Sequence, residues 1–452
     1  MSQPTIEILA LKKGFLRAAA EPTHALVRLV APEQPATTTT SQRAPLDLVL
    51  VIDRSGSMSG APLKAALESA CRIVSGLRPD DRVAVVTFDS HVDVLQPLTH
   101  PTHRDDLLQR IRAVQSGGST ALFDGWETGM RQLQGNVSRE RIARIILLSD
   151  GQANHGLTDI NAIAEHVAKA AAAGITTSTV GLGEGFNEQL MTRMARAGEG
   201  AANFGQTADD LDEAFEEQFA ILSNAFLRQV RLTIQGGSDV QARLLGDFLE
   251  EGLAQDRKLG TLPWASSLVA VVELKIGPAA RADSLLAVNF SAVTKEGVAV
   301  NFGPAILALP ELTLAEYSVL PTDPHVAAAV TEAVIAEKLE QIEELIRAGL
   351  VNDAKQALAA LIARPNLTDW VKQKVAYLQE LLEDDAVMAM KEMRYGRRSM
   401  TAGTKGVRVE EFSQDLAMQN HAAPLYVYKK LAAGRRTRRQ GPTPPPATPN
   451  QP

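Results

Sequence analysis

The sequence predicts an α/β fold with a doubly wound, mainly parallel sheet, inserted in a β-sandwich-like domain and followed by an α-helical region. Three observations support this prediction. Between Leu46 and about Ala225, apolar runs of strand length alternate with segments whose apolar residues recur at helical spacing. Strand-like runs precede this region and return after it, up to about Leu320. Helical spacing then prevails from Pro324 to about Met400.

The amino-terminal segment Thr5–Ala31 contains two short apolar runs without a helical stripe, which indicates two strands. Because two strands alone are only marginally stable, we expect them to pair with strands that follow the α/β region. A threonine-rich stretch at 35–41 is typical of a linker. We therefore assign residues 1–44 and 226–320 to one β-domain, and residues 45–225 to the domain inserted in it.

The inserted region alternates strands and helices in regular order. Its first run is broken only by Asp47, as expected for a strand that is buried on both faces of a sheet. The expected strands are Leu46–Ile52, Val83–Phe88, Ile142–Leu148 and Ile175–Val180, and the expected helices are Leu63–Leu77, Leu107–Val114, Ile160–Ala171, Leu190–Ala197 and Leu211–Leu222. Such sheets bind ligands outside the carboxyl ends of their strands.

The carboxyl-terminal part begins with further strands and ends in a tail. The expected strands are Val230–Ile234, Leu268–Ile276, Leu285–Phe290 and Val298–Phe302. In residues 321–400, Gly349 and Asn352 separate two helical stretches, which predicts an antiparallel helix pair that Trp370–Leu382 continues. Residues 401–452 carry an arginine cluster at 435–439 and a proline-rich end, so we expect an extended segment and a disordered tail.

Composition excludes several classes of function. The 452 residues include 46 Lys and Arg against 53 Asp and Glu, a net charge of −7, which argues against a nucleic-acid partner. The single cysteine, Cys71, excludes an intrachain disulfide and a multi-cysteine zinc site. Apolar runs are far shorter than the roughly 20 residues of a membrane span, and the amino terminus lacks a signal-peptide pattern. We therefore expect a cytoplasmic protein without a transmembrane segment.

A hydroxyl-rich motif follows the first strand of the α/β region. In Asp53-Arg54-Ser55-Gly56-Ser57, one carboxylate and two hydroxyls alternate along a tight loop, so all three side chains can converge on one point. These hard oxygen donors suit magnesium, which prefers octahedral oxygen coordination and retains some of its water. Two further loops can complete the site: Gly117–Thr120 offers a hydroxyl, and Ser149–Gly151 offers a second carboxylate.

At these motifs the chain resembles a von Willebrand factor A (VWA) domain with a metal-ion-dependent adhesion site. Asp53, Ser55 and Ser57 match the first motif of that family, Thr120 its threonine loop and Asp150 its second aspartate. The resemblance implies that these five residues hold Mg²⁺, with Mn²⁺ as an alternative, and that an exposed Asp or Glu of a protein partner completes the coordination. Ser119 could supply the same hydroxyl as Thr120.

The flanking regions resemble the intracellular bacterial VWA proteins, in which a β-domain and an α-helical region frame this domain. Related framing occurs in the inter-alpha-trypsin inhibitor heavy chains. These resemblances imply a metal-dependent scaffold or adaptor that is not an enzyme. They also leave open an accessory role in a bacterial kinase, phosphatase or AAA+ ATPase system. The sequence specifies no oligomeric state.

A hydrolase is the alternative of another class. Asp53 after a strand also resembles the nucleophile of haloacid dehalogenase-type phosphatases, so a metal-dependent phosphate-ester hydrolase is a second hypothesis. In those enzymes an acid two residues later donates a proton, and here Ser55 stands in its place.

Overall fold

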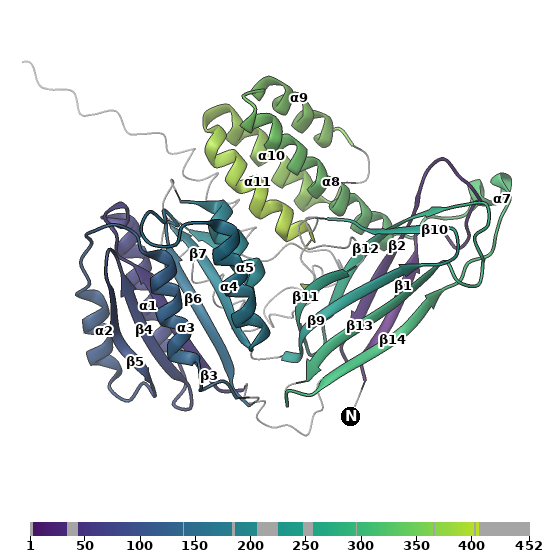
Figure 1. Cartoon of the computed structure of the whole chain (residues 1–452). Coiled ribbons are helices and arrows are strands. Elements are labelled where there is room, and N and C mark those ends of the chain that lie inside the picture. The colour runs from purple at the N-terminus through teal and green to yellow at the C-terminus, as the bar shows by residue number, and fades with distance from the viewer. Residues whose placement is uncertain are drawn as a thin grey trace, which may run out of the picture.

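The computed structural model describes residues 3–33, 44–138, 140–182, 186–205, 225–246, 256–294, 296–364, 367–401 and 404–405. Three predicted features lie outside these residues: the linker at 35–41, the helix at Leu211–Leu222, and the basic, proline-rich tail. Figure 1 shows three regions: an α/β region, a pair of antiparallel sheets, and a group of helices above their junction.

The α/β region is built on a six-stranded sheet with the strand order β5-β4-β3-β6-β7-β8. All neighbouring strands in it are parallel except β4 and β5, so the predicted mainly parallel sheet is confirmed. The strands are β3 (Leu46–Asp53), β4 (Arg82–Phe88), β5 (Val92–Thr99), β6 (Ile142–Ser149), β7 (Ile175–Leu182) and β8 (Glu199–Gly205). The sequence analysis did not predict β5 and β8.

Helices cover both faces of this sheet. Leu48 and Leu50 of β3 pack on the face covered by α1 and α2, whereas Val49 and Val51 pack on the face covered by α3, α4 and α5. Burial on both faces explains why the run from Leu48 to Ile52 is apolar at every position. The helices are α1 (Ala61–Gly76), α2 (Arg104–Arg112), α3 (Leu122–Leu133), α4 (Ile160–Ala172) and α5 (Glu188–Ala197), with a 3-10 turn η1 at Gly56–Met58. The helix α3 was not predicted.

Two antiparallel sheets form the sandwich into which the α/β region is inserted. Leu29 of β2 pairs with Leu268 of β12, which confirms that the amino-terminal strands join strands that follow the α/β region. One sheet has the order β1-β2-β12-β10 with β15 beside β12, and the other β11-β9-β13-β14. The strands are β1 (Thr5–Ala10), β2 (Thr23–Val30), β9 (Ala225–Gly236), β10 (Val240–Leu244), β11 (Asp256–Pro263), β12 (Ser267–Ile276), β13 (Leu286–Thr294), β14 (Ala299–Leu307) and β15 (Thr404–Lys405).

The helical region packs on both other regions. Val326 of α8 packs against Leu26 and Val271 on the outer face of the first sheet. Toward the α/β region, Arg394 of α11 donates to Glu188 of α5 at 2.6 Å and also contacts the buried Glu343 of α8. The helices are α7 (Leu314–Val319), α8 (Pro324–Arg347), α9 (Val351–Ile362), α10 (Asp369–Asp384) and α11 (Ala386–Thr401).

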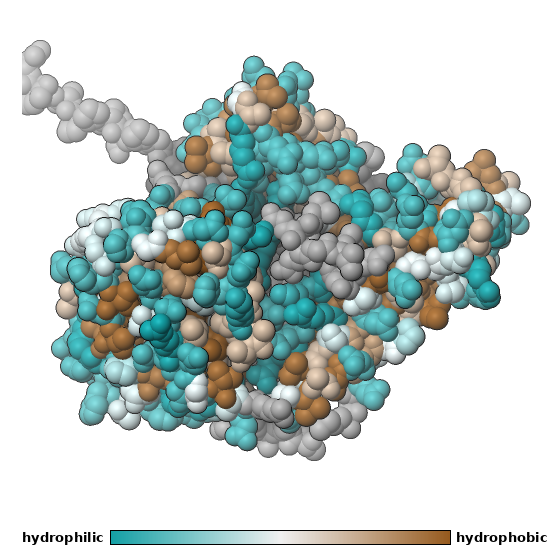
Figure 2. All heavy atoms as spheres, viewed as in Figure 1, coloured by the Kyte–Doolittle hydropathy of each residue, from teal (hydrophilic) through white to brown (hydrophobic). Residues whose placement is uncertain are grey.

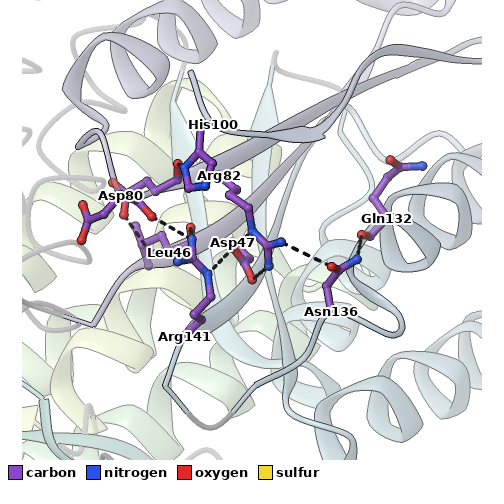
Figure 3. Close-up of polar contacts among 9 residues, drawn as sticks. Leu46, Asp47, Asp80, Arg82, His100, Gln132, Asn136 and Arg141 are labelled. Carbon is purple, nitrogen blue, oxygen red and sulfur yellow. Dashed lines mark hydrogen bonds and ion pairs between the residues drawn. The ribbon is translucent and has the colours of Figure 1, made fainter. Parts of the chain in front are cut away.

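An ion-pair cluster holds the amino end of β3 (Figure 3). Asp47 is 1% exposed, and both of its oxygens accept from Arg82, at 2.8 and 2.6 Å. Arg141 donates to Asp47 at 2.7 Å and to the carbonyl oxygens of Leu46 and Asp80 at 3.0 and 2.9 Å. The hydrogen bonds that Arg82 donates to Asp47 raise the pKa of Arg82. The one interruption of the apolar run Leu46–Ile52 is thus a carboxylate neutralised by two arginines.

The surface is mixed in character. On the face seen in Figure 2, hydrophobic side chains of the described residues lie in small groups separated by hydrophilic ones. None of the described helices combines the length and apolar character needed to cross a membrane.

Candidate metal site

Asp53 ends β3 at the carboxyl edge of the sheet and is completely buried. One carboxylate oxygen accepts the backbone N–H of Ser55 at 2.8 Å, and the other accepts the hydroxyl of Ser149 at 2.5 Å. Ser149 in turn accepts the N–H of Gly151 at 2.8 Å. These bonds fix the orientation of the carboxylate and connect the loop after β3 to the loop after β6.

The charge of Asp53 has no cationic partner among the residues that the structure describes. Arg54, its neighbour in sequence, instead pairs with Asp89 and Asp93, at 3.2 and 2.6 Å. The pKa of Asp53 is raised to about 6, chiefly by burial and to a lesser extent by the negative charge of Asp150, although hydrogen bonds from Ser149 and Ser55 act to lower it. A divalent cation would relieve the cost of this buried charge.

The two serines of the motif face each other across the loop. The hydroxyl oxygens of Ser55 and Ser57 lie 3.2 Å apart, with Ser55 buried and Ser57 exposed. The buried Met58 anchors the 3-10 turn that contains Ser57. The N–H of Gly56 donates to the carbonyl oxygen of Gly118 at 3.1 Å, so this loop contacts the loop that carries Thr120.

The structure distinguishes Thr120 from its neighbour. Thr120 is 1% exposed, whereas Ser119 is exposed and bonds through both its N–H and its hydroxyl to the hydroxyl of Ser90. Gly118 has a φ of +71°, and a Cβ there would lie 2.7 Å from Ser90 Oγ. The loop therefore requires glycine at this close approach. This geometry favours Thr120 over Ser119 as the hydroxyl of the site.

Asp150 lies directly after β6 and is 6% exposed. Its carboxylate accepts the N–H of Gln152 at 3.1 Å, and its carbonyl oxygen accepts the N–H of Asn187 at 2.7 Å. Gly151 follows with a φ of +67°, and a Cβ there would lie 3.0 Å from Met191. The aspartate is thus held between the sheet edge and the start of α5.

The three loops that carry the five predicted residues are joined by these hydrogen bonds at one edge of the sheet. Sequence reasoning assigned no role to Ser149, although it lies between the predicted strand Ile142–Leu148 and Asp150. It also missed Asn154, whose amide oxygen accepts the N–H of Thr120 at 2.8 Å. A contact between two loops that are distant in sequence leaves no local pattern.

The donor set fits a small divalent cation. Among the described residues, no group of three or more His, Cys, Asp and Glu side chains is arranged to hold a metal. A site at this edge must therefore combine hydroxyl oxygens with its two buried carboxylates. Such a set of hard oxygen donors favours Mg²⁺ or Mn²⁺ over Zn²⁺.

Fold and site together define a domain of the von Willebrand factor class. The model of the von Willebrand factor type A domain matches residues 47–218, so this part of the chain is a VWA domain, as predicted. Domains of this type are commonly protein-interaction domains and often bind a divalent metal.

Curated relatives share this part of the chain. The chain is 30% identical over 216 residues to the protein YfbK of Escherichia coli, a match that covers 47% of this chain and 36% of YfbK. It is 27% identical over 197 residues to inter-alpha-trypsin inhibitor heavy chain H3 of Mesocricetus auratus, covering 42% of this chain and 22% of the relative. The chain thus spans less than half the length of these relatives.

Two solved structures resemble nearly the whole chain in fold. A von Willebrand factor type A protein from Catenulispora acidiphila aligns with a TM-score of 0.60 and 17% identity, covering 93% of this chain and 96% of that one. The ArnB paralog VWA2 from Sulfolobus acidocaldarius aligns with a TM-score of 0.56 and 18% identity, covering 88% and 99%. The likeness therefore extends well beyond the VWA domain.

Proposed function

We propose that this chain is a metal-dependent protein-binding scaffold or adaptor. It engages an acidic residue of its partner through a magnesium site at the carboxyl edge of the VWA sheet. The observation that carries the proposal is Asp53: a fully buried carboxylate without an ion pair in the described part of the chain, beside converging hydroxyls. Exposed Ser57 leaves one side of this constellation open to a partner.

Five residues have distinct roles in this proposal. Ser55, Ser57 and Thr120 contribute hydroxyl oxygens to the metal, and Asp53 and Asp150 balance its charge, directly or through water. When bound, a divalent cation with few direct anionic ligands supplies a coordination position that attracts one more carboxylate. The side chains of this protein then orient that position toward solvent. We also propose that the protein is bacterial and acts in the cytoplasm, as expected from the sequence.

The geometry gives less support to a phosphate-ester hydrolase. A nucleophilic aspartate needs a neighbouring proton donor, and Ser55 occupies the position where that acid is expected. The Asp53 carboxylate is also fully buried and engaged by Ser149 and Ser55. We therefore propose a binding protein and not an enzyme. Metal-dependent turnover of a generic phosphate ester that Asp53→Asn abolishes would favour the hydrolase.

An affinity pull-down from native lysate tests the proposed function. Wild type and the Asp53→Ala/Ser55→Ala variant are compared in magnesium and in EDTA, with Ser59→Ala as a control at an exposed serine of the same loop. We expect partners that wild type and Ser59→Ala retain only in magnesium and that the double variant loses. The same set of proteins in every lane would contradict a metal-dependent interaction.

A further inference from the structure

We propose that Asn154 is a positioning residue of the metal site, acting through Thr120. This inference rests on the proposed function, since it assumes that Thr120 contributes its hydroxyl to a bound cation. Asn154 lies outside the five residues that match the VWA motifs. It follows Asp150 in the loop after β6, so it comes from a different part of the chain than Thr120.

The backbone of Thr120 is held on both sides by the segment around Asn154. The amide oxygen of Asn154 accepts the N–H of Thr120 at 2.8 Å. The carbonyl oxygen of Thr120 accepts the N–H groups of Asn154 and His155, at 3.2 and 3.3 Å. Only the first of these bonds depends on a side chain, so Asn154 is the one position in this segment where a substitution removes a bond to Thr120.

The loop from Asp150 to His155, together with Ser149 before it, forms hydrogen bonds with both of the other loops. Ala153 N–H donates to the carbonyl oxygen of Gly151 at 2.8 Å, which closes a tight turn after Asp150. At one end of this stretch, the hydroxyl of Ser149 donates to Asp53. At the other end, the amide oxygen of Asn154 accepts the N–H of Thr120. The stretch from Ser149 to Asn154 therefore contacts both the carboxylate of Asp53 and the backbone of Thr120.

Loss of the Asn154 amide would leave the N–H of Thr120 without this partner, while the two bonds to the Thr120 carbonyl oxygen remain. Thr120 is 1% exposed and is preceded by Gly117 and Gly118, which permit the backbone to move. A buried N–H without a partner is unfavourable, so the loop would shift to satisfy it and carry the hydroxyl away from the site. Residues that orient metal ligands from outside the coordination sphere typically change metal affinity by about 10- to 100-fold.

A double-mutant cycle with Mn²⁺ as the probe tests this inference. EDTA-stripped full-length protein is titrated with Mn²⁺ and followed by electron paramagnetic resonance, for wild type, Asn154→Ala, Thr120→Ala and the double variant. We expect Asn154→Ala to weaken Mn²⁺ binding about 10-fold in the wild-type background, and less than about 2-fold in the Thr120→Ala background. Equal losses in both backgrounds would overturn an action through Thr120.

Two further variants separate positioning from a general effect on the loop. Asn154→Asp keeps an acceptor for the Thr120 N–H and adds a negative charge near the site, so it should retain or strengthen Mn²⁺ binding, which Asn154→Ala should weaken. His155→Ala is the matched control, because His155 contacts Thr120 only through its backbone N–H among the bonds that the structure describes. Thermal unfolding of the metal-free variants checks folding; since Asn154 is exposed, we expect little change. If Asn154→Ala does unfold, Asn154→Ser replaces it in the cycle.

The outcomes distinguish this inference from the proposed function. Wild-type protein that takes up no Mn²⁺ would overturn the metal site, and the role of Asn154 with it. Wild-type binding with unchanged affinity in Asn154→Ala would overturn only the role of Asn154.

Discussion

The two ends of β3 each bury an aspartate, and the two aspartates have opposite surroundings. At the amino end, Asp47 is 1% exposed and receives hydrogen bonds from Arg82 and Arg141. At the carboxyl end, Asp53 is 0% exposed and is held by a serine hydroxyl and a backbone N–H. The strand is the same, and burial is nearly the same. What differs is whether the protein itself supplies the positive charge.

Under the proposed function, this difference separates a structural carboxylate, Asp47, from a metal-binding one, Asp53. A buried charge is stable only when it is paired, and the Asp47 cluster supplies its own pair. At Asp53 the described part of the chain provides only neutral donors, and in the proposed function a cation from solution balances the charge. Buried aspartates without an internal cation at the carboxyl edge of a parallel sheet therefore deserve the first test for metal binding.

The largest expected effect is at the structural end. Asp47→Asn removes the charge that neutralises Arg82 and Arg141, and breaking a buried ion pair on one side typically costs about 3–5 kcal/mol. Both arginines are partly exposed, which places the expected loss of unfolding free energy near the lower end of that range. Urea unfolding in EDTA measures it. A loss below about 1 kcal/mol, as is typical of a surface ion pair, would contradict a structural role for Asp47.

At the carboxyl end of β3, we expect a substitution of the aspartate to have the opposite effect on the unfolding free energy. Burial raises the pKa of Asp53 from 3.8 to about 6, so its charge costs the metal-free protein roughly 3 kcal/mol at neutral pH. Asp53→Asn removes that charge but weakens the hydrogen bond with Ser149. In EDTA at pH 7, its unfolding free energy should therefore equal or exceed that of wild type, by at most this amount. A clear loss of stability would show that Asp53 is structural in the way that Asp47 is.

Adding Mg²⁺ should stabilise the protein only through the proposed site at the carboxyl end of β3. At a Mg²⁺ concentration about 100 times the dissociation constant, mass action contributes about 2.7 kcal/mol to the unfolding free energy. We expect Ser55→Ala to lose most of this gain and Ser59→Ala to keep it. Thermal unfolding with Mg²⁺ and with EDTA measures the difference. Equal gains in both variants would place the cation elsewhere.

The smallest expected effect is on the pH dependence of stability, and it arises from a residue away from both ends of β3. Burial lowers the pKa of His24 in β2, and nearby Arg243 also lowers it, whereas Glu273 and Glu337 raise it. Because the folded state binds the proton less readily than the unfolded state, His24 contributes stability above its unfolded pKa of about 6.5 that is lost as the pH falls below it. His24→Gln should therefore flatten the stability profile of metal-free protein between about pH 7 and 5. An unchanged profile would contradict this assignment.

The sequence was informative where apolar pattern or local motif decides the structure. The run Leu46–Ile52 predicted a central strand, and the motif from Asp53 to Ser57 predicted the position of the site. Other elements had weak patterns: β5 contains Pro97 and exposed residues, and β8 begins with Glu199-Gly200-Ala201-Ala202. The spacing of Leu122, Trp126, Met130 and Leu133 is typical of a helix, but it follows directly on a glycine-rich loop, which is typical of irregular structure.

Side-chain contacts between distant segments were not predictable from one sequence, although the pairing of the amino-terminal strands with later strands was. Asp47 meets Arg82 and Arg141 because three strands lie side by side, and Asn154 meets Thr120 because two loops share one sheet edge. Such contacts depend on the register of the sheet, which local patterns do not encode.

Isothermal titration of EDTA-stripped protein with Mg²⁺ tests the central claim most directly. Wild type, Asp47→Asn and Asp53→Asn are compared at the same pH and temperature, below the unfolding transition of each. We predict one Mg²⁺ site in wild type, the same affinity in Asp47→Asn, and at least a 100-fold weaker affinity in Asp53→Asn. Equal Mg²⁺ binding by wild type and Asp53→Asn, or none by wild type, would contradict the account.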